Sequence, residues 1–100
     1  MKPVLAISDR DNVATALVRL EPGQTLDVSG HTVVVRQAIP AGHKVALTEI
    51  VEGGSVIKYG AAIGTATAAI PPGAHVHTHN VASARGRGDL AQAARGGRND

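Results

Sequence analysis

The sequence IPPGAHV at residues 70–76 is the fourth copy of a turn pattern that recurs along the chain. The pattern is Leu or Ile, two residues, Gly, two residues, then Leu or Val, and it also reads LEPGQTL at 20–26, IPAGHKV at 39–45 and IVEGGSV at 50–56. In each unit we expect a buried aliphatic residue, a tight turn that Gly permits at positive φ, and a second aliphatic residue that begins the return strand. Pro precedes Gly in three of the four units and pre-sets the turn.

The spacing of these units predicts an all-β domain with an internal pseudo-repeat. The first and third glycines stand 30 residues apart and the second and fourth 31 apart, which suggests an internal duplication. Turns this close together leave no room for helices of ordinary length. The segment 13–20 is ambiguous, because Asp11 or Asn12 could cap a helix while its β-branched residues favour a strand. We predict a strand there, and further short strands at 31–36, 56–59 and 65–68.

Composition limits how the domain can be stabilised. The chain has 100 residues, no cysteine and one aromatic residue, Tyr59, so the core must be built from aliphatic side chains. We predict that Tyr59 fills the centre and that Gly60 and Gly64 bracket a turn. A core this thin leads us to expect support from a partner or a metal. Any metal would need His, Asn or carboxylate ligands, or ligands from another chain.

The charge distribution argues against a nucleic-acid partner. Residues 1–82, the predicted folded domain, hold six Lys or Arg and six Asp or Glu. The segment 83–100 is rich in Gly, Ala and Arg, and we interpret it as a flexible tail. It has no aromatic residue to stack on a base. The first nine residues hold too short an apolar run for a signal peptide, and no stretch is long enough to span a membrane, so we expect a cytoplasmic protein.

Three of the five histidines alternate in the segment HVHTHN at 75–80. If this segment is extended, His75, His77 and His79 share one face, with neighbours about 6.6 Å apart along the strand. Imidazoles at that separation can lean onto one divalent ion or form the edge of an active site that a partner completes. Three surface imidazoles on an edge strand remain the alternative.

Four motifs, taken in order, resemble a known family. They are DNVATAL at 11–17, GHKVAL at 42–47, VIKYG with IG at 56–64, and HVHTHN at 75–80. Together they are similar to the N-terminal module of the altronate and galactarate dehydratases, a domain of the SAF or β-clip type, over residues 1 to about 82. The resemblance implies a β-clip fold.

The resemblance also implies an enzyme that dehydrates sugar acids to 2-keto-3-deoxy acids with ferrous iron, or another divalent metal such as Mn²⁺. In that family the module is fused to a large catalytic domain or forms a separate small subunit, and the sulfolactate sulfo-lyase has such a subunit. This chain stops where the fused enzymes continue, so we expect a free-standing small subunit or an excised module that is inactive without the large catalytic subunit. A homo-oligomer of this chain is a further alternative.

The resemblance implies that His77 and His79 serve catalysis and metal binding and that Asn80 contacts substrate. The alternating spacing makes His75 a further candidate metal ligand, at a position where the family pattern is looser. His43 and Lys44 follow the second Gly turn and are candidate substrate-binding residues, because an ammonium group suits a sugar-acid carboxylate and a neighbouring imidazole could relay a proton. A solvated turn is the alternative for this pair. A non-catalytic carbohydrate-binding or assembly module is the alternative to an enzyme subunit.

Overall fold

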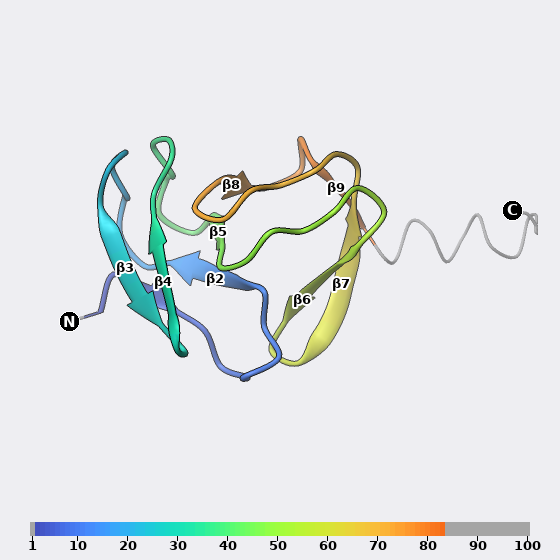
Figure 1. Ribbon diagram of the computed structural model, residues 1–100, viewed down its shortest axis with the longest axis horizontal. Coiled ribbons are helices and arrows are strands. Elements are labelled where there is room, and N and C mark those ends of the chain that lie inside the picture. The colour runs from blue at the N-terminus through green and yellow to red at the C-terminus, as the bar shows by residue number, and fades with distance from the viewer. Residues whose placement is uncertain (1, 84–100) are drawn as a thin grey trace, which may run out of the picture.

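The computed structural model describes residues 2–83, so the predicted tail beyond Ser83 lies outside the described residues. The described chain forms short strands and no helix, which confirms the all-β prediction (Figure 1). The strands are β1 Val4–Leu5, β2 Val13–Ala16, β3 Thr25–Val28, β4 His31–Val34, β5 Lys44–Ala46, β6 Ser55–Lys58, β7 Ala61–Ala66, β8 His75–Val76 and β9 Val81–Ser83. Within residues 2–83 no helix is long and apolar enough to cross a membrane.

The strands form three small antiparallel sheets. A four-stranded sheet has the order β1-β2-β5-β8, a two-stranded sheet joins β3 to β4, and a three-stranded sheet has the order β6-β7-β9. In Figure 1 the β3–β4 hairpin stands at one end of the domain, the β6–β7 hairpin at the other, and β2, β5 and β8 lie between them. The central sheet therefore joins segments that are far apart in the sequence.

The predicted turn at each repeat unit is present. The central glycine of every unit has the same positive φ, between 84° and 89°, at Gly23, Gly42, Gly53 and Gly73. The aliphatic residues that open the units pair across the structure, because an isolated bridge joins Leu20 to Ile39 and another joins Ile50 to Ile70. The two halves thus repeat in three dimensions as they do in the sequence.

Two aliphatic cores lie on opposite faces of the central sheet. Consecutive residues on one strand belong to different cores: Val45 packs into the first, and Ala46 into the second. The β3–β4 hairpin covers the first core with Leu26 and Val33, while Val56 of β6 enters the second. Each half of the internal repeat therefore covers one face of the central sheet. Both faces are buried, and the edge of the sheet is the accessible part.

The predicted position of Tyr59 is wrong. Its side chain is 53% exposed, and Lys58 Nζ lies 4.9 Å from the ring centroid. Tyr59 and Gly60 have φ of 56° and 76° and form the two-residue turn between β6 and β7, a type I′ geometry that matches the twist of a hairpin. Gly64 does not bracket that turn. It lies in β7, where a Cβ would overlap the carbonyl oxygen of Ala82 in β9.

Asp11 is a buried carboxylate that ties two loops together. Its Oδ2 accepts hydrogen bonds from the backbone N–H groups of Ile7 and Ser8 at 3.1 and 3.2 Å, and its Oδ1 accepts one from Gly60 at 2.7 Å. Burial raises the pKa of Asp11, but the hydrogen bonds from backbone N–H groups outweigh burial and hold this pKa below its usual value. Asp11 therefore fixes the segment after β1 against the β6–β7 turn.

Asp11→Ala is expected to lower the free energy of unfolding by about 2–3 kcal/mol, because three backbone donors lose their acceptor. Urea unfolding near neutral pH measures the change, and Asp9→Ala, at an exposed position, is the control. Since the folded pKa lies below the ordinary 3.8, the contribution is complete above that pH and is lost as pH falls through the folded pKa. An equal difference between wild type and Asp11→Ala at all pH values would contradict this role.

Candidate functional site

The pairing of β5 with β8 brings two distant histidine segments together. The register joins Lys44 to Val76 and Val45 to His75. Continued by one residue, it sets His43 opposite His77, and opposite residues of an antiparallel pair point to the same face. His75 lies two residues before His77 and shares that face as well. The strand register thus collects three imidazoles at one corner of the central sheet.

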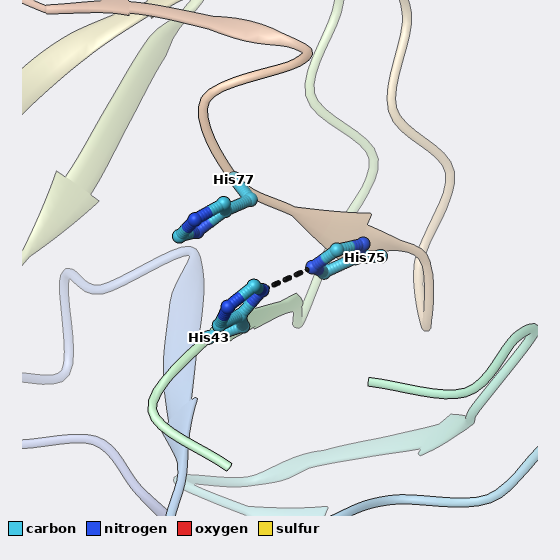
Figure 2. A group of neighbouring side chains, drawn as sticks. All are labelled: His43, His75 and His77. Atoms are coloured by element: carbon cyan, nitrogen blue, oxygen red, sulfur yellow. Dashed lines mark hydrogen bonds between the residues drawn. The ribbon is translucent and has the colours of Figure 1, made fainter. Parts of the chain in front are cut away.

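The three rings are close and nearly parallel (Figure 2). The His43 and His77 ring centroids are 3.6 Å apart with planes 9° apart, and the centroids of His43 and His75 are 5.0 Å apart. His43 Nδ1 and His75 Nε2 are joined by a 2.8 Å hydrogen bond. One nitrogen from each ring lies within 4.8 Å of the other two, so these three residues could hold a metal ion. We refer to His43, His75 and His77 as the imidazole cluster.

His79 and Asn80 are placed by a turn and not by a strand. β8 ends at Val76, so the extended conformation predicted through His79 is wrong. The Asn80 side chain closes the turn, because Oδ1 accepts the His77 backbone N–H at 3.0 Å and Nδ2 donates to the His75 carbonyl at 2.9 Å. The His79 ring is exposed, lies 4.9 Å from that of His75 and is tilted by 37°. It borders the imidazole cluster without joining the convergent nitrogens.

The surroundings favour neutral imidazoles. Burial lowers the pKa of His75, with further lowering from His79 and His43. Burial also lowers the pKa of His77, and the nearby His43 and Lys44 add to this effect. His77 Nδ1 is a buried atom with no hydrogen-bond partner in the described part of the chain. A neutral ring with an unused buried nitrogen is suited to bind a metal.

Lys44 borders a pocket on the other face of β5. The pocket has a volume of about 160 Å³ and is lined by Lys44, Ile63, Val76, His77, Thr78, Val81 and Ser83. Burial lowers the pKa of Lys44, and the positive charge of Lys58 lowers it further. Within residues 2–83 the Lys44 ammonium has no ion pair, since Arg19 and Glu21 form the one ion pair found there. His77 borders both this pocket and the imidazole cluster.

The comparisons with known proteins agree on one family. Residues 2–84 match the model of the altronate/galactarate dehydratase SAF domain. The chain belongs to this SAF-domain family. It is 53% identical over 70 residues to altronate dehydratase of Escherichia coli, covering 70% of this chain and 14% of that enzyme. It is 41% identical over 80 residues to altronate dehydratase of Bacillus subtilis, covering 80% of this chain and 16% of that enzyme.

A smaller relative is covered almost completely. The SAF domain is 43% identical over 61 residues to the alpha subunit of (2R)-sulfolactate sulfo-lyase of Paracoccus pantotrophus, which covers 61% of this chain and 91% of that subunit. This chain therefore spans a small fraction of the altronate dehydratases and nearly all of one sulfo-lyase subunit. The relatives are lyases, and the predicted family and all-β fold are confirmed.

The predicted site residues divide into three groups in this SAF domain. His75 and His77 lie in the imidazole cluster, and His43, which the sequence assigned to substrate, lies there with them. Lys44 lies beside His77 in the pocket. His79 is exposed next to the cluster, and the Asn80 amide is occupied by the backbone of its own turn.

Proposed function

We propose that this SAF domain is the small subunit or N-terminal module of a metal-dependent sugar-acid dehydratase of the altronate or galactarate type. Its imidazole cluster and Lys44 form one wall of an active site that a larger catalytic part completes. The observation that carries the proposal is the convergence of three imidazoles at one rim of a domain whose relatives are lyases. Lys44, which forms no ion pair within residues 2–83, lines the pocket beside His77. The pocket beside Lys44 has a volume of about 160 Å³, which is smaller than the roughly 300–1,000 Å³ of typical ligand sites, and we therefore propose that activity requires the catalytic part.

Dehydration of a sugar acid needs a base and help for the leaving group. The C–H bond next to the carboxylate breaks, its electron pair forms a C=C bond, and the C–O bond at the neighbouring carbon breaks to release hydroxide. Hydroxide leaves as water after it gains a proton, and the enol product becomes the 2-keto-3-deoxy acid. His79, which borders the imidazole cluster, is our candidate for the proton transfers, because neutral imidazole accepts a proton near neutral pH and imidazolium donates one. His77 is our candidate for catalysis through the metal that it would help to hold.

A divalent metal at this rim fits the residues present. Three imidazole nitrogens converge, and His77 Nδ1 is buried without a partner among residues 2–83. A bound divalent metal supplies a Lewis acid that stabilises negative charge on oxygen. Fe²⁺ is the metal we propose for the assembled enzyme, with Mn²⁺ second.

The Lys44 ammonium is proposed to hold the substrate carboxylate in the pocket beside His77. Lys44→Ala in the complete enzyme is expected to lower kcat/KM by about 10- to 100-fold, mainly through KM, because a charge-assisted hydrogen bond contributes about 1.5–3 kcal/mol. Steady-state kinetics with the sugar acid measures this, and Lys2→Ala is the control at an exposed position away from this pocket. Unchanged kinetics in Lys44→Ala would remove Lys44 from the site.

The test of the function is an assay of the complete enzyme that contains this domain, as one chain or as a purified complex. Altronate, galactarate and sulfolactate are supplied in turn with Fe²⁺ or Mn²⁺. We expect a 2-keto-3-deoxy acid from altronate or galactarate. No turnover of either sugar acid, in an enzyme that remains folded and metal-loaded, would contradict the dehydratase proposal.

A sulfo-lyase subunit is the second candidate, because one alpha subunit of that enzyme is matched over 91% of its length. In that case the leaving group is sulfite, and the same assay would show sulfite release from sulfolactate with no reaction of the sugar acids. A non-catalytic binding or assembly module is the third outcome. It predicts that the purified domain binds a sugar acid and has no catalytic partner.

A further inference from the structure

We propose that His43, His75 and His77 form a complete three-imidazole site that binds one divalent transition-metal ion within this domain, without a ligand from the catalytic part. The ligand set differs from the alternating trio that the sequence pattern indicates, because His43 takes the place of His79. The inference deepens the proposed function by assigning the metal to the SAF domain, yet it stands on the geometry of the cluster alone.

The first support is the distance between the donor nitrogens. The ligand atoms of the imidazole cluster lie within 4.8 Å of one another, and the shortest pair, His43 Nδ1 and His75 Nε2, is at 2.8 Å. Nitrogens bound to one tetrahedral ion at metal–nitrogen distances of about 2.0–2.1 Å are about 3.4 Å apart. Side-chain rotations alone can therefore bring the three nitrogens to a common ion.

The second support is the rigid backbone under the ligands. His43 follows the turn at Gly42, and His75 follows the turn at Gly73 by two residues. The neighbouring Val45 and Val76 are fully buried, so β5 and β8 are anchored in the two cores. Binding then costs mainly the ordering of three side chains, because the strands that hold them are already fixed.

The stacked rings indicate what must move. The His43 and His77 rings are nearly parallel at 3.6 Å, whereas a metal ion lies in the plane of each imidazole that binds it. The His77 ring must therefore turn out of the stack, which also gives its buried Nδ1, without a hydrogen-bond partner among residues 2–83, a new environment. Metal binding is expected to open this stack and to replace the hydrogen bond between His43 and His75.

The donor set selects a class of metal. Within residues 2–83 the convergent group contains imidazoles alone, with no carboxylate. Imidazole suits Zn²⁺, Co²⁺, Ni²⁺, Cu²⁺ and iron, while Mg²⁺ and Ca²⁺ prefer oxygen. Three protein nitrogens also leave a fourth tetrahedral position open to water or to a substrate oxygen, as in catalytic zinc sites. In direct binding, Zn²⁺ and Co²⁺ are expected to exceed Fe²⁺ and Mn²⁺.

Titration of the metal-free 100-residue chain with Zn²⁺ and with Co²⁺ tests the inference. We expect one ion per chain, a visible Co²⁺ absorption typical of four-coordination, and no saturable binding of Mg²⁺. His43→Ala, His75→Ala and His77→Ala should each weaken binding at least about 100-fold, because losing a ligand exceeds the 10- to 100-fold cost of losing an outer-shell partner. The matched controls are His79→Ala, next to the cluster, and His31→Ala, in β4. Both should stay within about threefold of wild type.

The wild-type chain provides a readout that does not depend on the folding of any variant. Zn²⁺ should shift the ring ¹⁵N resonances of His43, His75 and His77 and leave those of His31 and His79 in place. Absence of one-to-one binding, or loss of binding in His79→Ala equal to that in His43→Ala, would overturn the assignment. A chain that binds metal in this way but belongs to an enzyme without lyase activity would uphold this inference and refute the proposed function.

Discussion

Gly73→Ala is expected to destabilise the domain by about 3–5 kcal/mol. Gly73 has φ of 84°, where an L-residue is strained by about 1–2 kcal/mol. A Cβ there would overlap the carbonyl oxygen of Val34, and the backbone is held at this point because the Arg36 N–H donates to the Gly73 carbonyl at 2.9 Å. Relieving such an overlap in a packed region costs a further 1–3 kcal/mol or so.

Gly23→Ala is the matched control for that substitution. Gly23 has φ of 88° in the equivalent turn of the first repeat, but a Cβ there would meet nothing within 4 Å. It should lose about 1–2 kcal/mol from backbone strain alone. Urea unfolding of both variants measures the difference. Equal losses would show that the contact between the Gly73 turn and the β3–β4 hairpin does not stabilise the segment that carries His75 and His77.

His77→Ala is expected to lower kcat of the complete enzyme by at least about 100-fold, because the variant loses one of the three proposed metal ligands. His77 stacks on His43 and also borders the Lys44 pocket, so it is the residue that links the cluster to the proposed carboxylate site. Its lowered pKa keeps the ring neutral at neutral pH.

The control for this prediction is His31→Ala, a histidine in the β3–β4 hairpin. It should leave kcat within about threefold of wild type, and thermal unfolding should show that both variants remain folded. A kcat for His77→Ala equal to that of His31→Ala would contradict the shared active site, whatever metal the enzyme holds.

The repeat predicted the turns because their chemistry is local. A Gly at positive φ between two aliphatic residues determines a turn without reference to the rest of the chain, and Gly23, Gly42, Gly53 and Gly73 all adopt it. The prediction for Tyr59 failed for a related reason. Composition suggested that the single aromatic ring must be buried, but two aliphatic cores are complete without it, and the hairpin turn exposes it.

The membership of the imidazole cluster could not be predicted from the histidine spacing. His43 joins it through the register of β5 against β8, a pairing between segments some 30 residues apart. A signal for this was present in the two units at 39–45 and 70–76, whose return strands are equivalent in the repeat. His79 does not continue the alternation of side chains along β8, because the Asn80 side chain closes a turn directly after Val76.

The most direct test of the shared active site is a crystal structure of the complete enzyme with a sugar-acid inhibitor bound. We predict that the inhibitor lies against His77, with its carboxylate within hydrogen-bonding distance of Lys44 Nζ. It would be contradicted by an inhibitor held entirely by the catalytic part while the rim of this domain faces solvent.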